Sequence, residues 1–89
     1  MPIVLVPTPY RGPTRGQGSI DVAGSTIRAC LEAVETDHPG FLELILDADG
    51  SLHRFVKIFL NKQQLEASAL DRAIEADDEI EVLAAIAGG

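Results

Sequence analysis

A single amphipathic helix limits what this chain can fold into. Four apolar residues recur at i, i+3, i+4 and i+7 and form one helical stripe; they are Ile27, Cys30, Leu31 and Val34. Ser25 or Thr26 can cap the first turn, and His38-Pro39-Gly40 ends the helix because the residue before proline disfavours the α region. One helix with one apolar face has to be covered by something else, which here is a sheet.

Short β-forming runs lie on both sides of this helix. The expected strands cover residues 3–6, 19–22, 52–60, 63–65 and 79–83. Residues 8–18 form a loop, 41–46 a short helical turn, and 67–76 a connection with one more helical turn. This order predicts an α+β domain with the helix on one face of a mixed four- to five-stranded sheet. The ubiquitin-like β-grasp, in which a hairpin precedes the helix, is the best candidate.

Length and charge exclude several classes of protein. With 89 residues the chain fits one domain, residues 1–89, and its size leaves little room for a deep catalytic cavity. The formal charge of -7 argues against nucleic acid, and no apolar run is long enough to span a membrane. A single cysteine excludes an internal disulfide, and the N-terminus does not resemble a signal peptide. We therefore expect a cytoplasmic protein that binds neither nucleic acid nor membrane.

The familiar patterns of catalytic and cofactor sites are absent. No phosphate-binding or dinucleotide-binding glycine motif is present, and two histidines with one cysteine do not make a zinc site. Residues 47–50 begin like a calcium loop, but the glycine comes too early and Ile58 stands where a glutamate is needed. We expect no bound cofactor and no metal. Cys30 is predicted to be a buried core thiol, and a catalytic cysteine is the less favoured alternative. His53 is either exposed at the end of a strand or a contact with a partner.

The last two residues are both glycine, directly after the last expected strand. With glycine at about 7% of residues, two terminal glycines occur by chance in roughly 0.5% of chains. A side-chain-free end can enter a narrow channel, and its α-carboxylate becomes an acyl donor once ATP converts it to an acyl-adenylate. Residues 84–89 are therefore predicted to form a flexible tail, with Gly88 and Gly89 carrying the chemistry.

The chain resembles the ubiquitin-like sulfur carriers of the molybdopterin synthase small subunit and thiamine sulfur carrier family. It is most similar to the mycobacterial cysteine-biosynthesis branch of that family. The matching segments cover nearly the whole chain; they are residues 6–11, 14–17, 24–26, 38–40, 52–56, 59–61 and 84–89. No single segment is diagnostic, and their order with the terminal Gly-Gly makes the resemblance specific.

The resemblance implies a protein co-substrate and not an enzyme. An adenylyl- and sulfurtransferase related to ubiquitin-activating enzymes would use Mg-ATP to activate Gly89, and sulfur would then form a C-terminal thiocarboxylate. A synthase would accept the sulfur to make cysteine or another sulfur-containing metabolite, and a metalloprotease that releases the product is a further implied partner. A non-catalytic small subunit of molybdopterin synthase and a ubiquitin-like protein modifier remain alternatives, as does an unrelated binding module with an irrelevant tail.

A partner surface is predicted on the sheet face turned away from the helix. In the strand over residues 52–60, Val56, Ile58 and Leu60 share one face and the intervening residues share the other. An exposed apolar patch of this kind usually marks a binding site. The predicted contact residues are Phe55, Lys57, Phe59, Leu83, Ile86 and Ala87.

Overall fold

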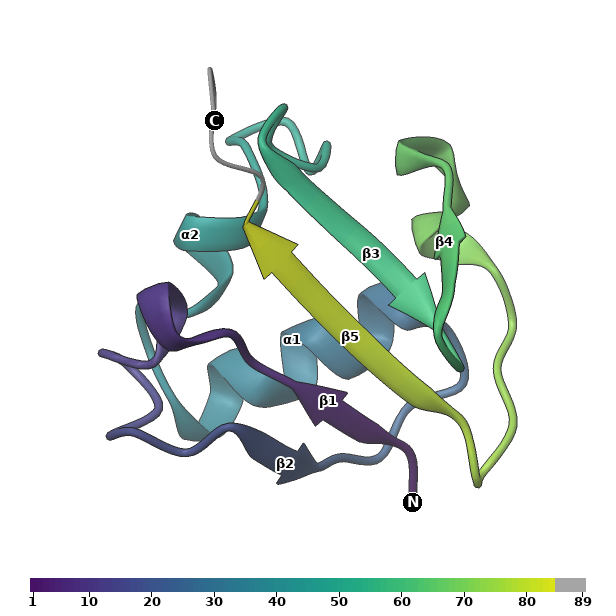
Figure 1. Ribbon diagram of the computed structural model, residues 1–89, viewed down its shortest axis with the longest axis horizontal. Helices are drawn as coiled ribbons and strands as arrows, with labels where there is room; N and C mark the ends of the chain where they lie inside the picture. The colour runs from purple at the N-terminus through teal and green to yellow at the C-terminus, as the bar shows by residue number, and fades with distance from the viewer. Residues whose placement is uncertain (85–89) are drawn as a thin grey trace.

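Five strands form one mixed sheet, and helix α1 crosses one of its faces (Figure 1). The computed structural model describes residues 1–84. The strands are β1 (Ile3–Leu5), β2 (Ser19–Asp21), β3 (Val56–Leu60), β4 (Gln63–Leu65) and β5 (Glu79–Ala84). The helices are α1 (Ile27–Asp37) and α2 (Leu42–Ile45), and two 3-10 turns cover Thr8–Tyr10 and Ala67–Asp71.

The strand order places β5 in the middle of the sheet. The order is β2-β1-β5-β3-β4, in which β1 and β5 are parallel and the other pairs are antiparallel. A parallel pair needs a crossover, and α1 with the following segments provides it. The predicted α+β class, the first hairpin and the helix packed on one face of the sheet are confirmed.

Helix α1 begins and ends where its sequence predicts. Thr26, one of the two proposed caps, accepts a hydrogen bond from the Ala29 amide at 3.0 Å through its side-chain oxygen. The helix stops at Asp37, and Gly40 then takes a positive φ of 100°. The four stripe residues are all fully buried against the sheet.

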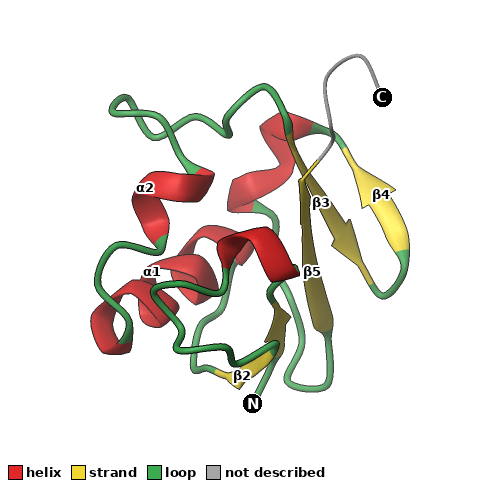
Figure 2. Cartoon of the chain, turned by 60° about the vertical axis from the view of Figure 1, so that its left-hand side comes forward, coloured by secondary structure: helices red, strands yellow, loops and turns green. Residues whose placement is uncertain are grey.

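All described elements contribute to one apolar core between the sheet and the helices (Figure 2). Its strand members alternate with exposed or half-buried residues, which is the period-two pattern of a sheet covered on one face. The buried strand residues are Val4, Ile20, Val56, Ile58, Leu60, Ile80 and Val82. Among the described residues, no helix has the length and apolar character needed to cross a membrane.

The strand predicted over residues 52–60 is shorter than expected. Leu52 pairs with Leu46 in an isolated bridge, and the His53 amide donates to the Ile45 carbonyl at 2.9 Å. Because this backbone is bonded to the α2 region and not to β5, the chain turns at residues 54–55 and β3 begins only at Val56. Phe55 therefore lies in a turn and not on the strand face with Lys57 and Phe59, which corrects that part of the prediction.

Two smaller features agree with or extend the sequence analysis. Asn61 and Lys62 both take positive φ, at 49° and 72°, in the predicted two-residue turn between β3 and β4. The loop over residues 8–18 is more structured than expected, because it contains the 3-10 turn Thr8–Tyr10 and a buried threonine, Thr14.

Candidate functional site

The predicted reactive tail continues from the central strand of the sheet. Strand β5 ends at Ala84, which is paired with Val56 of β3. Gly88 and Gly89, and the predicted contact residues Ile86 and Ala87, lie outside the described residues. What the structure provides is the geometry of the surface from which the tail begins.

The sheet face opposite α1 brings several of the predicted contact residues together. Lys57 of β3 is paired with Leu83 of β5, and Phe59 is paired with Glu81. Leu5 of β1 is the neighbour of Glu81 on the other side. We refer to Leu5, Lys57, Phe59, Glu81 and Leu83 as the outer face. Lys57 is exposed, and the other four residues are half-buried, so the face presents partly accessible apolar side chains with one charge of each sign.

Phe55 lies apart from the outer face. It is 45% exposed, and the Arg54 guanidinium carbon stands 5.1 Å from the centre of its ring. This distance is within the range of a cation–π contact. Phe55 is thus accessible, as predicted, but in the turn before β3.

His53 joins the turn after α2 to α2 itself. Its Nε2 lies 2.9 Å from the Glu43 carbonyl oxygen, and its Nδ1 is paired with the Asp47 carboxylate. Both partners are acceptors, and only the imidazolium form can donate from both ring nitrogens. The hydrogen bond to the Glu43 carbonyl and then the contact with Asp47 raise the pKa of His53 above its ordinary value. His53 is therefore a structural contact within the chain, an interpretation that the sequence did not suggest.

The raised pKa of His53 predicts a pH dependence of stability. A group whose pKa is higher in the folded protein stabilises it fully below the unfolded pKa, about 6.5, and that contribution is lost as pH rises through the folded pKa. Urea unfolding of the wild type and of His53→Gln between pH 6 and pH 8 measures this. We expect the free-energy difference between the two proteins to shrink with rising pH by about 0.2–1 kcal/mol, since His53 is partly solvated. A difference that grows with pH would contradict the assignment.

A cleft on the helical side is lined by several charged residues. It has a volume of about 710 Å³ and lies between α1, α2 and residues 46–53. Glu35 closes part of it by accepting hydrogen bonds from the amides of Gly40 and Leu42, at 3.1 and 2.7 Å. These bonds stabilise the turn between the two helices.

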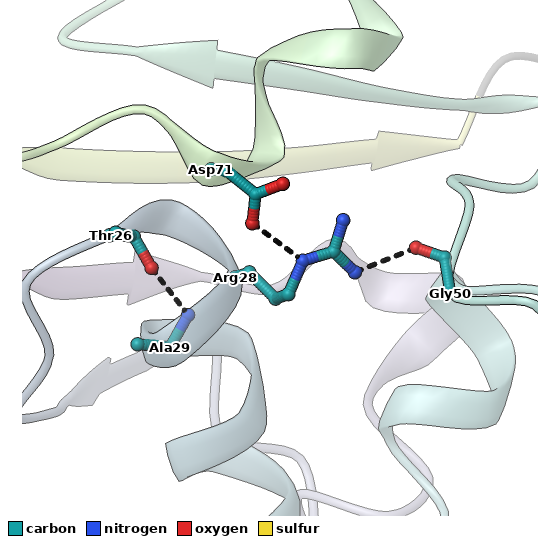
Figure 3. A network of polar contacts seen from close by, with 5 residues as sticks. All are labelled: Thr26, Arg28, Ala29, Gly50 and Asp71. Atoms are coloured by element: carbon teal, nitrogen blue, oxygen red, sulfur yellow. Dashed lines mark hydrogen bonds and ion pairs between the residues drawn. The ribbon is translucent and has the colours of Figure 1, made fainter.

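Arg28 joins three segments along the same side (Figure 3). Its Nε donates to Asp71 at 2.8 Å, and its Nη1 donates to the Gly50 carbonyl at 2.7 Å. Nothing in the sequence marks Arg28 as different from other polar helix residues, because its partners lie 43 and 22 positions away. These contacts position the turns around α1 and do not form a reaction centre.

Cys30 is a core residue. Its side chain is fully buried beside the other stripe residues, and burial raises the pKa of its thiol. A buried thiol of raised pKa is a poor nucleophile. Among residues 1–84, no three His, Cys, Asp or Glu side chains are grouped closely enough to hold a metal ion.

Comparison with known proteins places the chain in a family. The ThiS family pattern matches residues 4–89. The sulfur carrier protein CysO of Mycobacterium tuberculosis is 37% identical over 89 residues, which cover 97% of this chain and 96% of that protein. The Mycobacterium bovis sulfur carrier protein CysO matches equally well, with 37% identity over the same length.

Solved structures agree with this result. A chain of the crystal structure of the Amycolatopsis orientalis BexX/CysO complex superposes with a TM-score of 0.90 at 28% identity, and the match covers 100% of both chains. The crystal structure of Mycobacterium tuberculosis CysO superposes with a TM-score of 0.88 at 32% identity, covering 97% of this chain and 100% of that one. The fold is therefore the ubiquitin-like β-grasp, and the chain belongs to the ThiS family.

Proposed function

We propose that this protein is a sulfur carrier that bears sulfur as a thiocarboxylate on its C-terminal residue, Gly89. The observation that supports this most strongly is the family match, which extends along the chain from residue 4 to residue 89. Relatives that are 37% identical over nearly the full length are sulfur carrier proteins. The protein would act as a co-substrate of enzymes and not as an enzyme.

The proposed reaction has two steps on the C-terminal carboxylate. A carboxylate oxygen attacks the α-phosphorus of Mg-ATP, pyrophosphate leaves, and an acyl-adenylate forms. A sulfur nucleophile such as hydrosulfide then attacks the acyl carbon, the carbon–oxygen bond to AMP breaks, and a thiocarboxylate remains. Each step uses a group that the carrier lacks, so Mg-ATP and the catalytic residues belong to the activating enzyme. Gly88 and Gly89 have no side chains to obstruct close approach of a nucleotide.

The geometry of the described residues is consistent with this role. The tail follows the central strand, whose last residue, Ala84, is paired with Val56 of β3, whereas the pairing with β1 ends at Glu81. Around that origin the outer face offers Phe59 and Leu83 as partly accessible apolar contacts. A partner that covers the outer face can therefore receive the tail in a defined direction. Ile86 and Ala87 are proposed to extend this contact surface, and Phe55 is proposed as a contact at its edge.

We propose two kinds of enzyme partner for the loading and transfer of sulfur. One is an adenylyl- and sulfurtransferase related to ubiquitin-activating enzymes, and the other is a synthase that accepts the sulfur. The similar chain from Amycolatopsis orientalis was crystallised in a complex with BexX, which supports a function exercised while bound to a second protein. A metalloprotease that releases the product is a third proposed partner.

Reconstitution of sulfur loading tests this function. The purified chain is incubated with a ThiS-family activating enzyme, Mg-ATP and sulfide, and the intact mass is measured. We expect a mass gain equal to the exchange of one oxygen for sulfur, and no gain when ATP is omitted. Full-length protein that stays unmodified with the activating enzyme from its own genome would contradict the proposal.

Two further observations separate the alternatives. Adducts to lysine that resist thiol treatment would indicate a ubiquitin-like modifier. Stable co-purification with a larger subunit, without a free carrier pool, would indicate a small subunit of a synthase such as molybdopterin synthase. The sulfur carrier is preferred because relatives that are 37% identical over nearly the full length carry that function by name.

A further inference from the structure

The side chain of Arg11 is held in a defined position near the end of β5, from which the tail continues. Strands β1 and β5 are parallel, so the loop that follows β1 lies at the same end of the sheet as the start of the tail (Figure 1). A hollow of about 200 Å³ is found there, lined by Arg11 and Gly18 of the loop, by Leu5, and by Glu81 and Leu83 of β5. Arg11 therefore stands at the border of the outer face.

The loop holds the Arg11 backbone in place with internal hydrogen bonds. Thr14 is fully buried, and its hydroxyl lies 2.9 Å from the Gln17 carbonyl and 3.3 Å from the Arg11 carbonyl. The Gly16 amide donates to the Arg11 carbonyl at 2.9 Å. Arg15 and Gly16 take positive φ values of 56° and 83°, a conformation that is unfavourable for arginine. These hydrogen bonds hold the loop backbone, and with it the Cα of Arg11, in a defined position.

Gly18 leaves room for the Arg11 side chain. The Arg11 Nε donates to the Val6 carbonyl at 2.9 Å, which directs the guanidinium across Gly18. A Cβ atom at Gly18 would lie 2.5 Å from Nη2 and 2.7 Å from Cζ of Arg11. Since real Cβ atoms do not approach so closely, the observed side-chain position requires glycine at residue 18.

Among residues 1–84, only the Nε of the Arg11 side chain has a hydrogen-bond partner. Its two Nη amino groups make no hydrogen bond to a described residue, and no described carboxylate lies within 4.0 Å. Arg11 is half-buried as a residue, and its guanidinium, held at Nε, offers a planar pair of donors. That geometry matches a carboxylate, which can accept two parallel hydrogen bonds.

We infer that Arg11 binds a carboxylate side chain of the activating enzyme and thereby sets the affinity of the carrier for that enzyme. The inference rests on the proposed function, because it assumes an enzyme that takes the tail. Two observations favour a protein carboxylate. Arg11 shares a hollow with three residues of the outer face, which is the surface proposed for docking, and it lies at the end of the sheet where β5 ends. The phosphate groups of ATP are the competing ligand, and they are tested separately below.

Charge reversal at Arg11 is the first test, with Arg15→Glu as the matched control. Arg15 lies in the same loop, is exposed, and gives the same change in net charge. The rate of sulfur loading is measured against carrier concentration with the activating enzyme that loads the wild type. We expect Arg11→Glu to raise KM about tenfold to a hundredfold with kcat nearly unchanged, and Arg15→Glu to raise it less than about threefold. Thermal unfolding confirms that each variant is folded, and Arg11→Gln replaces Arg11→Glu if the reversed charge prevents folding.

Gly18→Ala is the second test, because it moves the Arg11 side chain without removing its charge. The atoms displaced are the far end of a flexible side chain, so the domain is expected to fold. Gly18→Ala should raise KM in the same direction as Arg11→Gln. The double variant should be no worse than Arg11→Gln alone, because both changes remove one contact. Additive effects would contradict the inference.

The outcomes separate the inference from the function on which it rests. A wild-type chain that is never loaded overturns the proposed function, and the inference with it. A wild type that is loaded, with Arg11→Glu equal to Arg15→Glu, overturns only the inference. If Arg11→Glu changes the KM for ATP and not the KM for the carrier, the ligand is a phosphate and the assignment to a protein carboxylate is wrong.

Discussion

Removal of Gly89 is expected to abolish sulfur loading, with no product detectable above the background without ATP. Under the proposed function the last residue supplies the acyl carbon, and its loss leaves Gly88 one residue short of the reaction centre. A displacement of one residue moves the carboxylate by about 3.3 Å, which is as large as the whole distance between reacting atoms in a productive complex. Intact-mass analysis after incubation with the activating enzyme, Mg-ATP and sulfide measures the loss.

Two controls make this result specific. Addition of one residue after Gly89 should also abolish loading, because the terminal carboxylate is displaced in the opposite direction. Addition of one residue before Met1, which is 69% exposed, should leave loading unchanged. The thermal unfolding midpoint should be the same for all of these proteins, since none of the three changes replaces a residue among 1–84. Loading of the shortened protein at the wild-type rate would show that Gly89 is not the reactive residue.

Phe41→Ala is expected to lower the free energy of unfolding by about 3–5 kcal/mol. Phe41 is fully buried between the two helices and is the largest residue in the core. Its removal leaves a cavity that the surrounding side chains fill only in part. Since small domains have total stabilities of about 5–15 kcal/mol, the variant should be marginally folded at best. Urea unfolding at fixed pH provides the measurement.

Phe59→Ala is the matched control for the core prediction. The same side chain is removed, but Phe59 is half-buried on the outer face, where no helix covers it. We expect a loss of about 1 kcal/mol, as for substitutions outside the core. Similar losses for the two variants would mean that the outer face is part of the core, and its role in docking would have to be abandoned.

The sequence predicts the fold well because the decisive patterns are local. The stripe from Ile27 to Val34, the cap at Thr26 and the stop signal that ends at Gly40 all lie within fifteen consecutive residues, and each is found as expected. The predicted length of β3 is wrong because a non-local contact shortens the strand. Leu52 is paired with Leu46 and the His53 amide donates to the Ile45 carbonyl, so the start of this segment is bonded near α2, and the sequence does not show that competition.

The residues of the candidate site also fall into two groups, those that a local pattern predicts and those that depend on non-local contacts. Lys57, Phe59 and Leu83 are placed together by strand alternation and pairing, which the sequence predicts. Arg28 and His53 acquire their contacts from partners in other segments, so no spacing rule identifies them. Gly18 is informative only with the structure, since the reason for glycine there is the side chain of Arg11.

The position of the sulfur atom tests the central claim most directly. The loaded protein is fragmented in a mass spectrometer, and the C-terminal fragment is compared with the fragment that contains Cys30. The account predicts that the exchange of oxygen for sulfur is confined to Gly89, and that Cys30→Ala, which removes the thiol, is loaded like the wild type. A loaded protein in which the C-terminal fragment with Gly89 has an unchanged mass, and the exchange lies in another fragment, would contradict the account.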